Sequence, residues 1–402
     1  MRIAHIANHF MPELGYTEYY LAKKQHEIGH EVCVITSDWY ISASGERYKK
    51  SGSLTQFEEG VEVFRLPSPI ELSGGVFVPI NKFKRCLIGF SPDVVHIHGA
   101  LSPMAFVSAL YKHTVGYRTV ANVISGKVIA RGVSLAIKTA LLKMYTKAIW
   151  PYVFNRIDCF VAYAEAAINW MQSELNIDPS RIRFVPLGAD SDLFRFNPDE
   201  RTIVREKLGI TDNDVVAIYT GKLLPHKRLD TLFYASAPLI KTCNNFRVLL
   251  VGKGPDQYVN HLKVIVKNLG ISRNVMFHNS VHRTALPIFY SAADFAIWPG
   301  HHSVSILEAM STGLPVIIAR SKWTNHLLEY KNGFDYEEGN IEALRPYIQT
   351  LLENGDLRRE MGRKSRKLVE KKLNWNNLTK KYVEVYRKVA KSRKDNARTY
   401  SH

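Results

Sequence analysis

The chain has 402 residues, which is too long for one ordinary hydrophobic core, so we expect two domains. Its 46% hydrophobic and 23% charged content is typical of a soluble globular protein, and no apolar run of about 18 residues predicts a membrane span. The net charge of +17 favours anionic partners such as phosphorylated substrates or acidic lipid headgroups, but no zinc spacing or aromatic RNA-binding box predicts specific nucleic-acid recognition.

The N-terminus and the cysteines predict the cellular compartment. The opening MRIAHIANHF lacks the basic-then-apolar layout of a signal peptide and instead predicts a strand that starts at residue 2. The four cysteines are scattered, with neither metal-site spacing nor a paired framework. We therefore expect a reducing, cytoplasmic location, with attachment at the inner face of the membrane if a basic helix contacts lipid.

Apolar runs rich in Val and Ile alternate with helical patterns in the first half of the chain. A helical pattern over 16–29 ends at Gly29, a residue type that commonly ends helices. Near-continuous apolar strands between helices indicate a parallel sheet that is buried on both faces. The predicted strands are 2–7, 31–36, 61–66, 93–98, 119–124 and 158–163.

The second half repeats this scheme, so the chain predicts two doubly wound α/β domains. Between the halves, residues 183–202 hold two prolines and several turn formers and are the expected linker. The predicted strands of this half are 214–221, 246–252, 274–279, 294–299 and 314–319.

Two basic segments remain open to two interpretations each. Residues 355–402 hold 16 Lys or Arg against 5 Asp or Glu, which suits either a solvated helical tail or an anionic-surface contact. Within them, apolar residues at helical spacing from Leu378 to Val389 favour a helix that packs one face on a domain over a membrane-binding helix. Residues 132–156 interleave lysines with apolar side chains, which suits an anionic membrane surface or a domain helix with a basic outer face.

Ligands of open α/β sheets bind beyond the carboxyl ends of the strands, where glycines and cations gather in this sequence. Gly15 precedes a helix and would leave room for a phosphate at the helix N-terminus, but by itself the pattern favours a simple strand-to-helix turn. Lys222 and Lys227 follow a strand that ends at Gly221, and two cations there would neutralise a diphosphate. The alternative is an exposed basic loop.

The remaining two loops exclude one kind of site and suggest another. Gly252 follows a strand without the third glycine of a dinucleotide fingerprint, and no Walker pattern occurs, so neither site is expected. Ser305 and Glu308 fit a capping box, which is the structural interpretation. The same helix start would suit a phosphate, with the carboxylate accepting hydrogen bonds from sugar hydroxyls.

The order and spacing of several stretches resemble the retaining glycosyltransferases of family 4 (glycosyl transferases group 1), which have the GT-B fold. These stretches are MRIAHIANHFMPELGYTE, DVVHIHG, RIRFVPLGADSDLF, YTGKLLPHKRLDTLF, LLVGKGP and LEAMSTGLPVIIA. The resemblance implies two Rossmann-like doubly wound domains that face across a cleft. Residues 1–187 would form the acceptor domain and 188–374 the donor domain, and a C-terminal helix over 375–395 would cross back to the first.

The resemblance also implies an activity. A hexosyl group would move from a UDP- or GDP-linked nucleotide sugar to a glycan, lipid-linked or small-molecule acceptor, with retention and without a metal or cofactor. Lys222 and Lys227 would contact the diphosphate, and Glu308 would hold the ribose hydroxyls. The other donor-side residues it implies are Gly15, Tyr16, Gly221, Gly252, Asn279, Val281, His301, His302, Ser303, Val304 and Ser305.

Three positions depart from the family pattern. The first Glu of the family motif falls at Gly300, the second glycine of the N-terminal loop at Tyr16, and the active-site His at Ser125. Ser125 and His98 are the acceptor-side candidates, and His98, His301 and His302 are the candidates to replace the lost histidine, although a surface role is expected for each. The alternative is a catalytically impaired GT-B subunit that binds nucleotide or partners another transferase.

Overall fold

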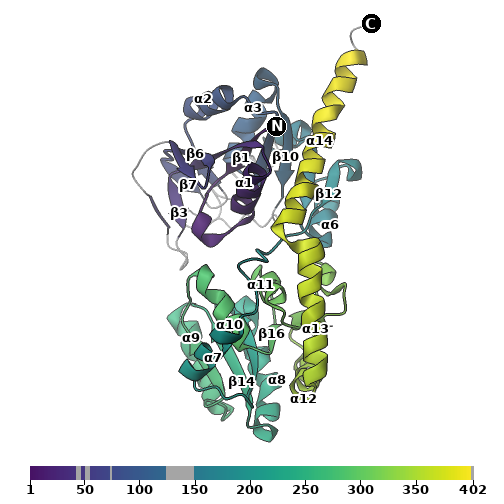
Figure 1. The fold of residues 1–402 in the computed structure, drawn as a ribbon. Helices are drawn as coiled ribbons and strands as arrows, with labels where there is room; N and C mark the ends of the chain where they lie inside the picture. The colour runs from purple at the N-terminus through teal and green to yellow at the C-terminus, as the bar shows by residue number, and fades with distance from the viewer. Residues whose placement is uncertain (42–46, 50–54, 73–74, 124–148, 400–402) are drawn as a thin grey trace. The chain divides into compact units, whose positions relative to one another are not determined.

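A computed structural model describes residues 1–41, 47–49, 55–72, 75–123 and 149–399 (Figure 1). Ser125 and residues 132–148 of the predicted basic helix therefore lie outside the described residues. No described helix combines the length and the apolar character that crossing a bilayer requires.

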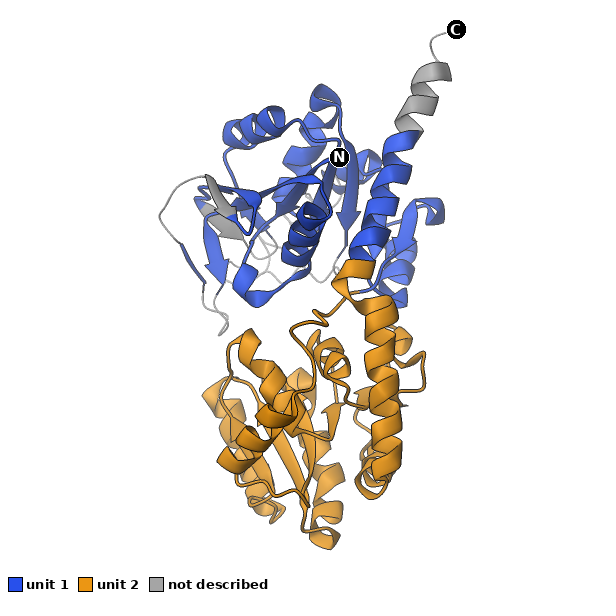
Figure 2. Ribbon diagram, in the orientation of Figure 1, with its two compact units in different colours: residues 1–186, 378–402 blue, residues 187–377 orange. Residues whose placement is uncertain are grey.

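The chain forms two compact units (Figure 2). Unit 1 comprises Met1–Pro186 and Leu378–His402, and unit 2 comprises Leu187–Asn377. The division falls within the expected linker, which is shorter than predicted because strand β12 occupies its start and helix α7 its end. Asn197 caps α7 by accepting hydrogen bonds from two backbone amides, and a proline follows it at the first helical position.

Unit 1 is built on an eight-stranded sheet in the order β12-β11-β10-β9-β1-β2-β6-β5, parallel except for the pairing of β5 with β6. The strands are β1 (Arg2–Ala7), β2 (Glu31–Ser37), β5 (Thr55–Glu58), β6 (Val61–Leu66), β9 (Val94–His98), β10 (Arg118–Asn122), β11 (Cys159–Ala162) and β12 (Ile182–Phe184). Two short antiparallel pairs, β3 (Trp39–Ile41) with β4 (Arg47–Lys49) and β7 (Ile70–Leu72) with β8 (Gly75–Phe77), were not predicted.

The helices of unit 1 pack apolar side chains on this sheet. They are α1 (Thr17–Glu27), α2 (Ile80–Phe90), α3 (Pro103–Val115), α5 (Trp150–Arg156), α6 (Glu165–Ser173) and α14 (Trp375–Thr399), with the 3-10 turns η1 (Pro12–Leu14) and η3 (Pro179–Arg181). In α14, Leu378, Tyr382 and Val385 are buried, as expected of a helix that packs one face on a domain. From Leu378 onward this helix belongs to unit 1.

Unit 2 is built on a six-stranded sheet in the order β15-β14-β13-β16-β17-β18, and every pairing in it is parallel. Its elements in chain order are α7 (Pro198–Lys207), β13 (Val215–Thr220), η4 (Pro225–Lys227), α8 (Leu229–Thr242), β14 (Phe246–Val251), α9 (Asp256–Asn268), β15 (Val275–His278), η5 (Arg283–Ala285), α10 (Leu286–Ala292), β16 (Phe295–Trp298), α11 (Ser305–Thr312), β17 (Val316–Ala319), η6 (Asn325–Leu328), β18 (Gly333–Tyr336), α12 (Ile341–Glu353), α13 (Gly355–Leu368) and the π-helical η7 (Val369–Leu373).

Strand order positions the site of unit 2. The chain runs outward from β13 through β14 to β15, then returns to place β16 on the other side of β13. Such a reversal of strand order leaves the loops at the carboxyl ends of β13 and β16 adjacent, which is where open α/β sheets bind ligands. The five strands predicted in this half are all present, so two Rossmann-like units are confirmed.

Candidate functional site

The loops that follow β13 and β16 are tied together at this switch point. The amide of His301 donates to the carbonyl of His226, at 3.1 Å. The ammonium of Lys227, at the end of η4, donates to the carbonyls of His301 and His302, each at 2.9 Å. These hydrogen bonds therefore hold together two loops that lie more than 70 residues apart in sequence.

Lys227 is a buried cation without an anionic partner. Its side chain is 8% exposed, and no carboxylate among the described residues forms an ion pair with it. Burial, aided by repulsion from the exposed Lys222, lowers the pKa of Lys227 to about 8. Two neutral carbonyls do not offset the charge, so an arriving anion would find a desolvated cation already in place.

Three glycines at this switch point allow a close approach between backbone segments of the β13 loop and its neighbours. A Cβ at Gly252 would overlap the carbonyl oxygen of Gly221, whose φ of 134° is itself unfavourable for other residues. A Cβ at Gly300 would stand 2.6 Å from the carbonyl oxygen of His226 and 2.8 Å from the carbonyl carbon of Lys227. The position where the family carries its first Glu thus has no room for a side chain.

Glu308 lies in the first turn of α11 and is 6% exposed. Its carboxylate accepts hydrogen bonds from Arg283 Nε at 3.2 Å and from the Tyr290 hydroxyl at 3.3 Å. Burial raises the pKa of Glu308, although Arg283 opposes the shift. Sequence reasoning missed Arg283 and Tyr290, which lie 25 and 18 residues upstream and carry no local signal.

The predicted capping box at this helix start is wrong. The helix begins at Ser305, so Val304 is the N-cap and makes no side-chain capping bond. The hydroxyl of Ser305 instead donates to the carbonyl of Thr220 at the end of β13, at 3.0 Å. The amide of Ser305 donates a long hydrogen bond to the Ser303 hydroxyl, at 3.4 Å, and the amides of Ile306 and Leu307 donate to the carbonyls of Ser303 and Val304, so a ligand would have to compete for the first-turn amides of α11.

The other residues of unit 2 that were expected on the donor side lie at the same edge of the sheet. Ser303 exchanges a hydrogen bond with Ser305, hydroxyl to hydroxyl, at 2.8 Å. Asn279 is exposed after β15, and Val281 packs against the core of unit 2. His301 is exposed as expected.

His302 is only partly a surface residue. Its ring is half-buried and stacks on Trp323, with ring centroids 5.2 Å apart. Burial lowers the pKa of His302 to about 4, so the ring is neutral at physiological pH.

The donor-side residues expected in unit 1 lie after β1. Gly15 ends η1 with a φ of 61°, in the left-handed region that favours glycine. Tyr16 precedes α1 and is 47% exposed. The next turn holds Glu18, a titratable residue that sequence reasoning missed, whose pKa burial raises to about 7.

His98 is not a surface residue, so that expectation is wrong. His5 on β1 pairs in register with His96 on β9, and His98 follows two residues later on the same face. The three side chains are buried, and burial lowers the pKa of all three, that of His5 to about 4. No local pattern could show this, because the cluster depends on the pairing of two strands about 90 residues apart.

A chain of hydrogen bonds satisfies most of the ring nitrogens in this histidine cluster. Asn122 Nδ2 meets His98 Nδ1 at 3.4 Å, His98 Nε2 meets His5 Nδ1 at 2.9 Å, and His5 Nε2 meets Gln25 Oε1 at 2.8 Å. His96 Nε2 has no partner among the described residues. One ring nitrogen of each histidine lies within 4.8 Å of the others, so this is the group in the described chain that could hold a metal ion.

These neutral histidines should make stability depend on pH. An unfolded histidine titrates near 6.5, whereas folded His5 titrates at about 4, so the unfolded chain binds more protons between these values. The free energy of unfolding should therefore fall as pH drops below about 6.5, by up to ~1.4 kcal/mol per pH unit for each such histidine. Urea unfolding at stepwise lower pH measures the slope. The variant His5→Gln should show a smaller slope than the parent protein. If His113→Gln, which changes an exposed histidine, reduced the slope as much, this assignment would be contradicted.

Two family models match the chain, and each covers most of one half. The model described as Glycosyltransferase Family 4 matches residues 16–193, and the model described as Glycosyl transferases group 1 matches residues 200–368. Together they span nearly all of the two units.

Individual proteins agree with these matches. The GDP-mannose-dependent alpha-(1-6)-phosphatidylinositol monomannoside mannosyltransferase of Mycolicibacterium smegmatis is 25% identical over 363 residues, which cover 86% of this chain and 88% of that protein. The D-inositol 3-phosphate glycosyltransferase of Geodermatophilus obscurus is 33% identical over 177 residues, which cover 42% and 39%. The solved structure of sucrose-phosphate synthase from Thermosynechococcus elongatus has a TM-score of 0.72 at 17% identity, covers 97% of this chain and 99% of that one, and supports the fold. The chain therefore belongs to the family-4 glycosyltransferases and has their GT-B fold of two Rossmann-like domains.

Proposed function

We propose that this glycosyltransferase moves a sugar from a nucleoside-diphosphate sugar to a glycan, lipid-linked or small-molecule acceptor, with retention and without a metal. The observation that carries the proposal is Lys227, a buried cation at the switch point of unit 2 that has no counter-charge within the part of the chain that the structure describes. A diphosphate supplies the missing anion. A metal is not needed for that purpose, because the lysines and the start of α11 already provide positive charge.

The proposed chemistry breaks the bond between the anomeric carbon and the diphosphate oxygen. Negative charge then grows on the departing phosphate, where Lys227, Lys222 and the amides of Val304 and Ser305 would stabilise it. The acceptor oxygen bonds to the anomeric carbon on the same face, and its proton passes to the leaving phosphate.

The buried carboxylate of Glu308 is proposed to hold the ribose. Arg283 and Tyr290 each engage one of its oxygens, at 3.2 and 3.3 Å. Each carboxylate oxygen has a second acceptor position, so two ribose hydroxyls can donate without displacing either partner. Asn279 and Val281 would border the base, and His301, His302 and Ser303 the diphosphate and sugar.

The domain roles follow the same proposal. Residues 188–374 would bind the donor, and residues 1–187 the acceptor, with Gly15 and Tyr16 near the donor phosphates and His98 and Ser125 on the acceptor side. The Mycolicibacterium smegmatis relative is named as GDP-mannose-dependent and as acting on a phosphatidylinositol monomannoside. GDP-linked sugars and inositol-bearing lipid acceptors are therefore the first compounds to test, beside UDP-linked ones. Residues 132–156 are the proposed contact with an anionic membrane.

A screen of nucleotide sugars tests the function. Mass spectrometry should detect hydrolysis or transfer for one donor, and the matching nucleoside diphosphate should raise the melting temperature. With that donor, Glu308→Gln should raise KM by roughly 10- to 100-fold, because one hydrogen bond to a charged group is worth about 1.5–3 kcal/mol. The amide keeps the shape of the carboxylate but loses the ion pair with Arg283, so the melting temperature should fall and KM is measured at a temperature where the variant is folded. An unchanged KM would remove Glu308 from the ribose site.

The packing of Gly300 favours a second candidate function, a catalytically impaired subunit that binds nucleotide. The site has no room for the Glu that the family places there to hold the donor sugar. Stabilisation by a nucleoside diphosphate without hydrolysis or transfer of any sugar in the screen would support this alternative.

A further inference from the structure

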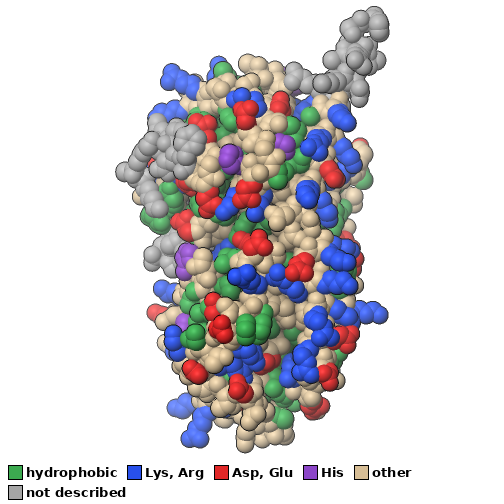
Figure 3. All heavy atoms as spheres, viewed as in Figure 1, with side chains coloured by type: hydrophobic (Ala, Val, Ile, Leu, Met, Phe, Trp, Pro, Cys, Tyr) green, Lys and Arg blue, Asp and Glu red, His purple; other side chains and the backbone are tan. Residues whose placement is uncertain are grey.

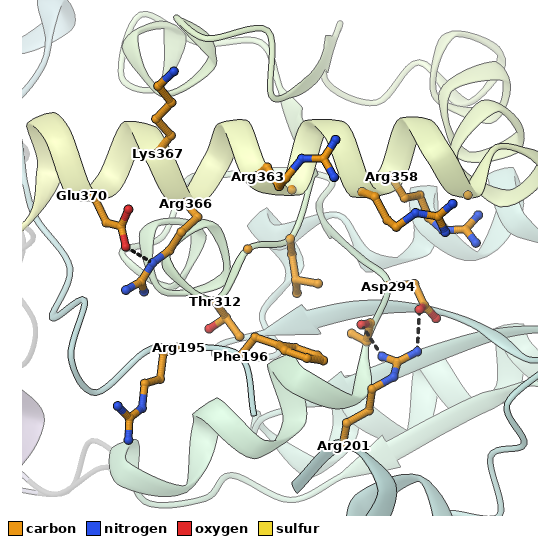
Figure 4. A pocket seen from close by; sticks show the side chains of 16 residues that line it. Arg195, Phe196, Arg201, Asp294, Thr312, Arg358, Arg363, Arg366, Lys367 and Glu370 are labelled. Carbon is orange, nitrogen blue, oxygen red and sulfur yellow. Dashed lines mark hydrogen bonds and ion pairs between the residues drawn. The ribbon is translucent and has the colours of Figure 1, made fainter. Parts of the chain in front are cut away.

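Unit 2 has a second candidate site at the other edge of its sheet. A pocket of about 780 Å³ is lined by Asp294, directly before β16, by Leu314, two residues before β17, and by one face of α13 (Figure 4). Strands β16 and β17 are parallel, so this amino-terminal edge is opposite the edge that holds Lys227. Four residues of strand span roughly 13 Å, which separates the pocket from the donor loops.

The pocket is strongly cationic. Figure 3 shows Lys and Arg side chains gathered over α13, and Figure 4 shows this helix along one side of the pocket. Residues four apart on a helix share a face, which explains why basic residues at this spacing line one wall. Two carboxylates, Asp294 and Glu370, also line the pocket. The seven cationic residues are Arg195, Arg201, Arg358, Arg359, Arg363, Arg366 and Lys367.

Both carboxylates are already engaged by fixed arginines. Arg366 Nε pairs with Glu370 at 2.6 Å, and Arg201 Nη2 pairs with Asp294 at 2.8 Å. Both guanidiniums also donate to main-chain carbonyls: Arg366 to three of them and Arg201 to two. Neither carboxylate therefore neutralises the remaining cations.

Arg359 pairs with Asp356, whereas Arg195, Arg363 and Lys367 have no counter-charge among the described residues. Within the described chain, no hydrogen bond or ion pair engages Arg195 or Arg363, and both side chains are exposed. Arg358 is held only by the neutral carbonyls of Leu351 and Leu352. Burial holds the pKa of Arg358 below its usual value; attraction by Asp294 opposes this shift, and repulsion from Arg359 and Arg201 adds to it.

We propose that this pocket binds a phosphate-bearing organic anion, at a site distinct from the donor site. The planar fork of a guanidinium matches phosphate oxygens in pairs, which favours phosphate over a simple carboxylate. The volume suits a ligand larger than a lone phosphate. Phe196, 52% exposed at the pocket, offers an apolar face to the organic part of the ligand. A lipid headgroup and a soluble organic phosphate share this chemistry.

The test removes the two unpaired arginines together. Calorimetry with tripolyphosphate, at about 0.15 M salt to screen weak surface attraction, is done in a Lys227→Met background so that the donor site does not contribute. Sedimentation with phosphatidylcholine vesicles, with and without phosphatidylinositol phosphate, forms the lipid arm. The variant R195Q/R363Q is compared with R273Q/K267Q, which removes the same charge from exposed positions of unit 2 outside the pocket.

R195Q/R363Q should weaken tripolyphosphate or vesicle binding by roughly tenfold or more, while R273Q/K267Q stays close to the parent. Loss in the calorimetric arm identifies a soluble phosphate as a sufficient ligand, and loss confined to the vesicle arm identifies the lipid headgroup. Equal weakening by both variants, or no binding in either arm, would overturn the proposal. The proposal would also be overturned if DNA competed fully with tripolyphosphate and bound R195Q/R363Q as tightly as the parent protein. The result is independent of whether the donor site transfers a sugar.

Discussion

Replacing Lys227 with methionine is expected to lower kcat/KM for the donor by roughly 10²- to 10³-fold, because one preorganised contact with the leaving group is lost. Methionine keeps the apolar stem, so unit 2 should remain folded. The ammonium also bonds the carbonyls of His301 and His302, and losing these bonds should cost about 1–3 kcal/mol of stability. The effect on catalysis should therefore exceed the effect on folding, and steady-state kinetics with thermal melting measures both.

The matched control is Lys253→Met. Lys253 is exposed, and its carbonyl accepts a hydrogen bond from Leu223 in the same β13 loop, so its side chain can be changed while the loop contact stays. This variant should behave like the parent protein. If Lys227→Met lost stability but kept its turnover within a few-fold, the lysine would serve only to hold the two loops together.

The lowered pKa of Lys227 adds a pH signature to this result. The free protein loses the Lys227 proton as pH rises through about 8, so the cation that would attract the diphosphate disappears there. Donor kcat/KM should fall above that pH. Lys227→Arg should keep its charge and lack this decline, even if its overall rate is lower, because a guanidinium does not titrate in this range.

The strands and the candidate loops of unit 2 could be predicted because their signals are local. Apolar runs predicted all five strands found between β13 and β17, and the lysines and Glu308 follow strand ends within a few residues. The contacts between these loops could not be predicted. Lys227 reaches His301 only because β16 lies beside β13, and that order follows from the packing of the whole sheet.

The same distinction explains the errors. S-x-x-E predicts a capping box from neighbours in sequence, whereas Ser305 bonds a carbonyl 85 residues away. His98 looked like a surface residue because its neighbours His5 and Asn122 come from other strands. Side chains whose partners come from distant strands are therefore assigned correctly only once the strand order is known.

Gly300→Glu, which restores the residue that the family pattern has at this position, is expected to damage the protein. The new Cβ would stand 2.6 Å from the carbonyl oxygen of His226, so either the turn that carries Lys227 or the β16 loop must shift. Overpacking of this kind typically costs about 1–3 kcal/mol. Since the displaced turn positions Lys227, activity should fall roughly as far as in Lys227→Met, about 10²-fold or more.

Gly300→Ala separates the effect of packing from that of charge, because the Cβ alone makes the clash. It should lose stability and activity almost as Gly300→Glu does, whereas Gly89→Ala, at a glycine with open space around it and ordinary backbone angles, should not destabilise the protein. If Gly300→Glu instead matched the parent in melting temperature and gained activity, the β13 turn would not pack on Gly300 as described. The site would then have room at position 300 for a carboxylate that binds the donor sugar.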